Sequence, residues 1–404
     1  MNALSAIRNN KYFTIVLLNI ALFIRAMILL SPIMLLFYQE NGLSVKELFF
    51  FQGIFYLVSI TIELPVGYIA DCFSKKKVLI FSFLAFLSGI VLWYFFSGYA
   101  IILTGEILFA ISKVSMDISS SGYLYDYLAS CNMQQNMSKY WGYLNFFLAG
   151  GTAAVGIIGA YLYSHFGSSN VLILEMILIT SGICLLLMLK NIPSAKTEKI
   201  KISERYKDFV CGLKYVWHNE KIKGYILYSG LLVSLSILFA LSFQPLMQKA
   251  AFPVVLFGVV SFTNHGIRAI SSAIAGKLPF NIYKMRVPLY ILYVLSFIAI
   301  IILNFSKDIP INLTLIVCIC LIIGVQLAFT ILHVARLHKY VDSTCRGMAM
   351  SVNNIIPKML TVVILLSSRF FMQNTELWKF FSYYFVFFLI VGFVLLIKTR
   401  NIKE

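Results

Sequence analysis

Among the ionisable residues within the long apolar stretches of the chain, four could act together: Arg25 in the first stretch, and Glu106, Lys113 and Asp117 in the fourth. A charge inside a membrane is costly, so such residues usually face a water-filled cavity or pair with one another. Spacings of seven and four place the three residues of the fourth stretch on one helix face. At 1.5 Å per residue, Glu106 lies about 10 Å outward from Lys113 and Asp117 about 6 Å inward.

These residue types could carry protons across a membrane. A carboxylate flanked by cations stays ionised, whereas a carboxylate isolated in an apolar cavity takes up a proton. Glu106 and Asp117 are therefore candidate proton carriers in a charge network that changes partners. The alternative interpretation is a static cluster in which Lys113 and Asp117 neutralise each other. Glu175, a single charge in the sixth apolar stretch, is assigned no role.

The composition indicates a protein that crosses a membrane many times. Of the 404 residues, 60% are hydrophobic and 12% are charged, and that charged fraction is roughly half the value for soluble proteins. Stretches of 18 or more apolar residues recur, the length that crosses about 30 Å of hydrocarbon. They are too long for barrel strands and do not alternate, so they are predicted to be helices.

The loops predict the topology. We place twelve spans at 12–38, 47–70, 77–96, 100–128, 139–163, 169–189, 222–246, 253–275, 287–304, 310–338, 345–371 and 377–398. Odd-to-even connections hold few cations, whereas even-to-odd connections and both terminal segments hold many: Arg8, Lys11, 75–77, Lys139, Lys277, Lys284, Arg286, Lys339, Arg346, Lys398, Arg400 and Lys403. Cations near span ends are retained in the cytoplasm, so both termini are predicted to be cytoplasmic. This asymmetry also explains the net charge of +17 without nucleic-acid binding.

The longest polar stretch divides the chain into two halves. We expect an N-terminal six-helix bundle at 1–189, a cytoplasmic linker at 190–221 and a C-terminal six-helix bundle at 222–404. Within the linker, apolar residues recur at helical spacing: Tyr206, Phe209, Val210, Leu213, Val216 and Trp217. This pattern predicts an amphipathic helix on the cytoplasmic leaflet.

The turn between the second and third spans combines a glycine, an acid and a run of cations. Gly67 lies one helical turn before Asp71, and a glycine there lets a neighbouring helix approach closely. An acid beyond it can meet the positive N-terminal end of another helix. Lys75 and Lys76 follow within the same short turn. At the inner end of the fourth span, Asp126 is predicted to be a partner for such loop cations.

This turn resembles the signature of the major facilitator superfamily, which has Gly, three residues, Asp and then a basic run. Gly67 and Asp71 match, Lys75 and Lys76 fill the basic positions, and Ser74 replaces the usual second glycine. The resemblance implies an all-α integral membrane protein of twelve transmembrane helices in two six-helix halves. It also implies that helices 1, 4, 7 and 10 line a central cavity, where Arg25 and the charged face of the fourth span would meet.

Other residues carry the resemblance further. Glu63, followed by Leu64 and Pro65, resembles the drug-efflux members of the superfamily and is predicted to act in gating. His333 and Arg336 lie one turn apart toward the inner end of the tenth span. They either line the cavity or extend to the membrane interface, and both interpretations stay open.

The resemblance implies a secondary transporter. Our interpretation is proton-coupled export of a small amphipathic compound, a drug or a peptide antibiotic of microcin type, through a bacterial inner membrane. Arg25 and Lys113 favour a substrate of negative or zwitterionic character. The fifth span holds Gly150 and Gly151 but lacks the proline of drug–proton antiporters. The alternatives are a proton-coupled importer of a sugar or organic anion, and a non-transporting immunity or interaction protein.

Several motifs are absent from the sequence. It has no nucleotide-binding Gly-x-x-x-x-Gly-Lys loop and no hydrolase or metalloprotease motif. The seven cysteines form no disulfide framework and no zinc spacing. We therefore expect no enzymatic activity, no cofactor and no metal, with the proton gradient as driving force and a monomer as the functional form.

Overall fold

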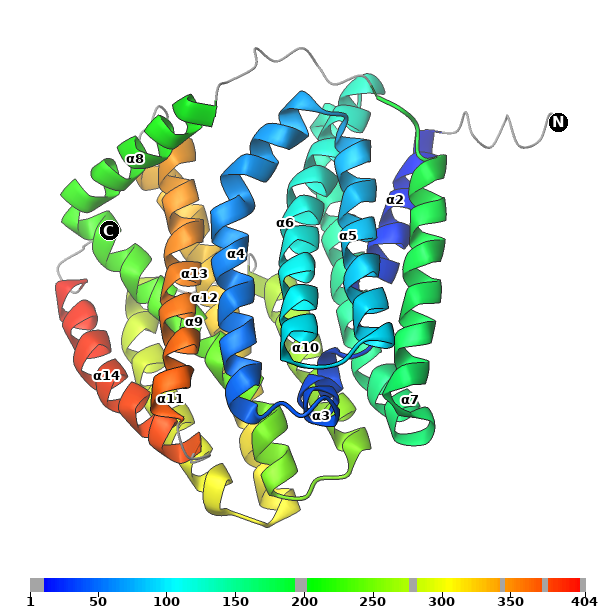
Figure 1. Cartoon of the computed structure of the whole chain (residues 1–404). Coiled ribbons are helices and arrows are strands. Elements are labelled where there is room, and N and C mark those ends of the chain that lie inside the picture. The colour runs from blue at the N-terminus through cyan, green and yellow to red at the C-terminus, as the bar shows by residue number, and fades with distance from the viewer. Residues whose placement is uncertain (1–10, 193–201, 276–281, 342–345, 373–376, 400–404) are drawn as a thin grey trace. The chain divides into compact units, whose positions relative to one another are not determined.

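Long helices joined by short connections make up the computed structural model, which describes residues 11–192, 202–275, 282–341, 346–372 and 377–399 (Figure 1). No strand occurs within those ranges. The helices are α2 (Lys11–Ala26), η1 (Ser31–Ile33), α3 (Met34–Glu40), α4 (Val45–Cys72), α5 (Lys75–Phe95), α6 (Tyr99–Ser130), η2 (Gln134–Asn136), α7 (Met137–Met188), α8 (Ile202–His218), α9 (Glu220–Lys249), α10 (Val254–Ala275), α11 (Ile282–Phe305), α12 (Ile309–Tyr340), α13 (Arg346–Phe371) and α14 (Leu377–Lys398). The predicted all-α membrane fold is confirmed.

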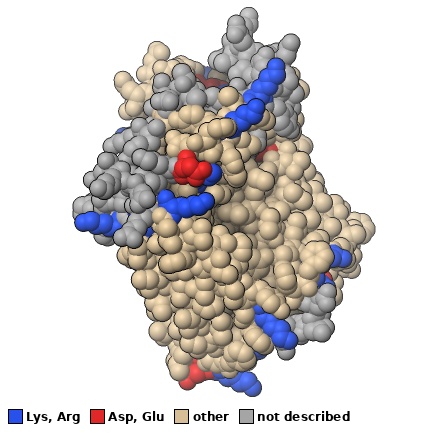
Figure 2. Space-filling model, turned by 90° about the vertical axis from the view of Figure 1, so that its left-hand side faces the viewer, with Lys and Arg blue, Asp and Glu red and all other residues tan. Residues whose placement is uncertain are grey.

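Ten helical segments of the described chain are long and apolar enough to cross a membrane. One of them, Lys139–Met188, contains both the fifth and the sixth predicted spans. The fourth predicted span corresponds to α6, which is not among the ten and carries four charged side chains. Most of the surface shown in Figure 2 is uncharged, as expected for a protein whose surroundings are largely lipid.

Packing divides the chain into two compact units. Unit 1 comprises Met1–Gly42 and Val58–Arg205, and unit 2 comprises Leu43–Leu57 and Tyr206–Glu404. The boundary therefore falls inside α4, whose first part belongs to unit 2. There the Phe49 ring lies 5.7 Å from that of Phe380. From sequence order alone, the whole of α4 would be assigned to the N-terminal bundle.

In unit 1, α2 packs along α7 and α5 packs along α6. The backbones of α2 and α7 approach closely at two glycines. A Cβ added to Gly151 would lie 2.5 Å from the Phe23 carbonyl oxygen, and one added to Gly159 would lie 2.1 Å from that of Leu29. Close packing of helices thus explains the glycines of the fifth span.

The first span is interrupted near its middle. Helix α2 ends at Ala26, and the chain passes through a turn at Leu29 and Leu30 before η1 and α3 continue in the same segment. Pro32 lies just after this turn. Proline has no amide hydrogen and clashes with the carbonyl of the residue four positions earlier, here Ile28, so Pro32 favours an interruption of the helix at this point.

The fifth and sixth spans are also joined by a break, at Gly167 within α7. Its φ of 75° and ψ of 173° are not helical. A positive φ of this kind is readily adopted only by glycine. The break falls between 139–163 and 169–189, where the sequence separated the two spans.

Unit 2 is held together by aromatic packing and by α8. The ring of Phe297 lies 4.9 Å from that of Phe239 and 5.8 Å from that of Phe388. Helix α8 buries Val216 in an apolar cluster with Ile222 of α9 and others. The predicted amphipathic helix therefore exists, and its buried side packs on unit 2.

Candidate functional site

Arg25 is fully enclosed inside unit 1. Its residue is 2% exposed, its guanidinium carbon lies 3.6 Å from the centre of the Phe86 ring, and Nη2 donates a hydrogen bond to Ser112 Oγ at 2.8 Å. Ser112 in turn donates to the Ser82 carbonyl oxygen at 2.6 Å. The Arg25 Nε has no hydrogen-bond partner among the described residues. Three helices, α2, α5 and α6, thus hold this cation.

Two carboxylates lie near enough to Arg25 to attract its charge: Glu175 of α7, and more weakly Asp117 of α6. Glu175 is 1% exposed. Neither of its carboxylate oxygens has a hydrogen-bond partner of good geometry within the described ranges. The backbone amides of Leu29 and Leu30, in the interruption of the first span, lie close enough to stabilise a charge there.

Glu106 occupies a separate polar contact. It is 1% exposed, and its Oε1 accepts a hydrogen bond of 2.5 Å from the Tyr38 hydroxyl of α3. The Tyr38 ring lies 6.1 Å from the Trp93 ring of α5 in an edge-to-face arrangement. Glu106 is therefore fixed among α3, α5 and α6.

Lys113 and Asp117 form an ion pair on the surface of α6. The Lys113 Nζ lies 2.6 Å and 2.5 Å from the two carboxylate oxygens of Asp117. Both side chains are about half exposed, at 49% and 51%. The shared helix face of Glu106, Lys113 and Asp117 thus divides into a buried acid and an accessible pair.

The turn between α4 and α5 is bound to the C-terminal parts of α6 and α7. Lys75 Nζ lies 2.7 Å from Asp126 of α6, and its side chain crosses Gly122, where a Cβ would lie 2.8 Å from Lys75 Cδ. Lys76 is buried and donates to the carbonyl oxygens of Leu187 and Leu189, at 2.9 Å and 2.6 Å. A cation at these terminal carbonyls of α7 satisfies groups that the helix leaves unpaired.

The remaining residues of the predicted gating motif lie on the second part of α4. Gly67 is buried, Glu63 is half-buried and Asp71 is exposed. Both acids make interactions with other residues.

Unit 2 contains its own buried polar groups, and these are neutral or cationic. His333 is buried, lies 3.3 Å from Asn353 Oδ1 and stacks on Tyr225 with ring centres 5.8 Å apart. Arg336, one turn on, is half-buried. Ser236 hydrogen-bonds to the Tyr293 hydroxyl at 2.5 Å and to Gln326 at 3.1 Å.

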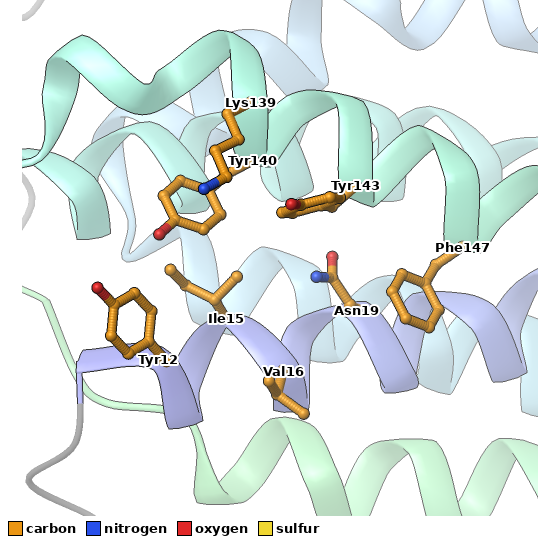
Figure 3. A pocket seen from close by; sticks show the side chains of 8 residues that line it. All are labelled: Tyr12, Ile15, Val16, Asn19, Lys139, Tyr140, Tyr143 and Phe147. Carbon is orange, nitrogen blue, oxygen red and sulfur yellow. The ribbon is translucent and has the colours of Figure 1, made fainter. Parts of the chain in front are cut away.

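A hollow of about 370 Å³ lies between the first turns of α2 and α7. Figure 3 shows residues from both helices around it. They are mostly aromatic or aliphatic, with one cation and one amide: Tyr12, Ile15, Val16, Asn19, Lys139, Tyr140, Tyr143 and Phe147. The Lys139 Nζ lies 5.9 Å from the centre of the Tyr140 ring. Such a lining suits an amphipathic compound.

From the sequence, Glu175 was not connected with Arg25. The two residues are 150 positions apart, and only the packing of α7 on α2 brings them together. The available signal was that the first and sixth spans each carry a buried charge, of opposite sign, near mid-span. The described residues contain no group of three or more His, Cys, Asp or Glu side chains that could hold a metal ion.

Long apolar helices with ionisable side chains in their interiors define a multi-pass membrane protein. The chain matches the model of the Major Facilitator Superfamily over residues 15–357 and belongs to this superfamily, which is a family of transporters. A search of curated proteins finds no match.

Several solved structures share the fold. The nucleoside transporter NupG has a TM-score of 0.75 at 14% identity, over 96% of this chain and 100% of NupG. A bacterial homologue of the iron transporter ferroportin has a TM-score of 0.68 at 15% identity, over 99% of this chain and 100% of that chain. A bacterial homologue of the human lysosomal transporter Spinster has a TM-score of 0.64 at 12% identity, over 98% of this chain and 97% of that chain. At such identities the likeness concerns the fold alone.

Proposed function

We propose that the protein exports a small amphipathic compound, such as a drug or peptide antibiotic, by alternating access in exchange for protons. The observation that carries this proposal is the set of ionisable side chains inside unit 1. Arg25 has one hydrogen bond from its guanidinium to Ser112 and two carboxylates nearby. Buried charges of this kind are costly and usually serve transport or proton relay.

The accessible pair on α6 supports the same mechanism. Lys113 and Asp117 are half exposed, so a substrate with negative or zwitterionic character can contact Lys113 while Asp117 takes up a proton. Glu106 is the second candidate carrier. Exchange of partners among these groups would link proton uptake to release of the substrate.

The hollow between α2 and α7 supports an amphipathic substrate. Its aromatic and aliphatic side chains offer apolar contact, and Lys139 and Asn19 offer polar contact. Pockets for small molecules commonly combine an apolar lining with a few polar groups that orient the ligand.

The contacts of Lys75 and Lys76 support a gating role for the turn between α4 and α5. These residues join the start of α5 to α6 and to the end of α7, so movement of α5 relative to these two helices would break or form these contacts. We place this turn and both termini in the cytoplasm of a bacterial cell, with the protein acting as a monomer in the inner membrane. It needs no cofactor and binds no nucleic acid in this proposal.

The direction of transport is tested in proteoliposomes with the purified full chain and an imposed pH gradient. Candidate drugs and amphipathic peptides would be loaded on one side, and flux measured with and without the gradient. Movement of substrate against the proton flow supports export. Movement of substrate with the protons would instead establish the importer of a sugar or organic anion, which the cations Arg25 and Lys113 would also suit.

The proton-carrier roles are tested by replacing each acid with its amide. Asp117→Asn and Glu106→Gln should each abolish proton-driven transport while the protein still inserts. Asp308→Asn is the matched control, because Asp308 caps the start of α12 in unit 2 and has no place in the proposed pathway. Normal coupled flux in both carrier variants would refute these roles.

A further inference from the structure

Glu175 has no role in the proposed pathway, and its surroundings do not suit an ionised carboxylate. It is a buried acid in the second part of α7, and neither carboxylate oxygen is hydrogen-bonded to a described residue. An ionised carboxylate in an apolar interior is strongly disfavoured unless it is both paired and hydrogen-bonded. Burying a protonated, neutral carboxyl group in the same place costs far less free energy.

The nearest cation is also incompletely satisfied. Arg25 donates to Ser112, while its Nε has no partner in the described part of the chain. A guanidinium offers five donors in a planar fork suited to a carboxylate. If Glu175 were ionised, pairing with Arg25 would satisfy both groups. Their separation in this structure therefore indicates a Glu175 that holds a proton.

The interruption of the first span lies beside the same carboxyl group. The amides of Leu29 and Leu30 lie near Glu175, and the backbone around them approaches Gly159 of α7 closely. An ionised Glu175 would draw both these amides and Arg25 toward itself, because both stabilise negative charge. The charge on Glu175 would thus act on the point where α2 ends.

We propose that Glu175 is a proton-binding site whose occupancy sets the partner of Arg25 and the geometry of the break after α2. With the proton bound, Arg25 donates to Ser112, as in this structure. When the proton leaves to water, Arg25 moves to the carboxylate, and the amides of Leu29 and Leu30 turn toward it. This site deepens the proposed transport mechanism and rests on it for its use in coupling.

The other charged groups around this site have their own partners. On α6, Asp117 acts on Arg25 and is paired with Lys113. On α5, Lys76 binds the last carbonyls of α7, about 18 Å along the helix from Glu175. The Arg25 guanidinium is therefore the charge that most strongly acts on Glu175 from outside its own helix.

The test is infrared difference spectroscopy of the full chain in lipid nanodiscs, following the C=O band of a protonated carboxyl group as the pH is raised. The wild-type protein should show a band that is lost at high pH, and Glu175→Gln should lack it. Glu40→Gln is the matched control, since Glu40 is an exposed acid that accepts from Tyr163 at the end of α3. Its band should equal that of the wild type. Loss of the wild-type band in Glu40→Gln, or an unchanged band in Glu175→Gln, would overturn the proposal.

Transport in proteoliposomes separates this site from the proposed function. Glu175→Gln should keep substrate exchange at equal pH on both sides and lose accumulation driven by a pH gradient. Normal accumulation in this variant would overturn the coupling role of Glu175 while proton-coupled transport stood. A wild-type protein with the band but without proton-driven flux would overturn the proposed function and leave the proton site intact.

A second variant distinguishes loss of the proton site from a folding defect. Glu175→Asp keeps an ionisable group and shortens its reach toward Arg25 by one methylene. It should keep a titrating carboxyl band at a shifted midpoint pH. Absence of any band in a variant that unfolds at the wild-type temperature would contradict the site.

Discussion

The interiors of the two units differ in the sign and number of their charges. Unit 1 buries Arg25, Glu106 and Glu175 in the middle of its spans. In unit 2 the sequence has no acid between Glu220 and Asp308 or within any later predicted span. There Ser236 bonds to Tyr293 and Gln326. One side-chain atom each of Asn264, Asn304 and Ser368 has no hydrogen-bond partner among the described residues.

This contrast shows two ways to hold polar groups in a membrane. In unit 2, the buried polar groups of the described residues are mostly neutral hydroxyls and amides. They do not change charge with pH, whether or not each has a hydrogen-bond partner. In unit 1, acids and bases lie close together without complete hydrogen bonding, so their partners depend on protonation. We infer that unit 1 responds to pH, and that the neutral interior of unit 2 does not.

The largest effect is expected at Arg25. Arg25→Gln should abolish proton-driven transport, because Glu175 loses the cation that moves to it when its proton leaves. Breaking a static buried ion pair costs about 3–5 kcal/mol, and we expect a smaller loss here because Glu175 is not hydrogen-bonded to Arg25 in this structure. Transport in proteoliposomes and unfolding in nanodiscs measure the two effects. Full transport in the variant would show that the charges of unit 1 are structural.

The matched change in unit 2 is Arg336→Gln. Arg336 is a half-buried cation of α12, and no buried acid of the described unit 2 depends on it. It should lose less transport than Arg25→Gln and keep its dependence on the pH gradient. Loss of the gradient dependence would remove the distinction between the two units.

Tyr38→Phe should have the next largest effect. The variant leaves Glu106 without the hydrogen bond that Tyr38 donates, and an unsatisfied buried polar group costs about 1–3 kcal/mol. We expect a lower unfolding temperature in nanodiscs. Trp93→Phe, which alters the ring beside Tyr38 and keeps its hydroxyl, is a useful control for packing. Equal stability of Tyr38→Phe and the wild type would show that Glu106 is held by its other contacts.

The fold could be predicted from the sequence because hydropathy and span length depend on local composition. The pair Lys113–Asp117 was also within reach, since residues four apart are neighbours on any helix. The contact of Lys75 with Asp126 could be predicted as well, because the two residues have opposite charges and lie at span ends that the topology places on the same side of the membrane.

The proximity of Arg25 to Glu175 could not be predicted from local patterns of this kind. It depends on which helices pack together, and on the break between α2 and η1 in a stretch whose hydropathy is continuous. The assignment of the first part of α4 to unit 2 is likewise a result of tertiary packing. Local patterns in the sequence carry no information of this kind.

A smaller effect is expected in the neutral network of unit 2. Ser236→Ala removes hydrogen bonds to Tyr293 and Gln326, and Tyr293 keeps its bond to the Leu232 carbonyl. The loss should be about 0.5–1.5 kcal/mol, with an unchanged pH dependence of transport. Stability is measured by unfolding in nanodiscs at several pH values. A loss that varied with pH would show that this network is coupled to a titrating group.

The smallest effect on stability is expected for the pair on α6, although its effect on transport is large. A double-mutant cycle with Lys113→Gln and Asp117→Asn measures how strongly the two side chains interact. Both are half exposed, and a solvated pair of this kind contributes about 0.2–1 kcal/mol. A coupling in that range indicates that the pair faces water, where it can meet a substrate and exchange protons. A coupling of several kcal/mol would place the pair in hydrocarbon, and the charges of unit 1 that act in transport would then be the enclosed ones, Arg25 and Glu175.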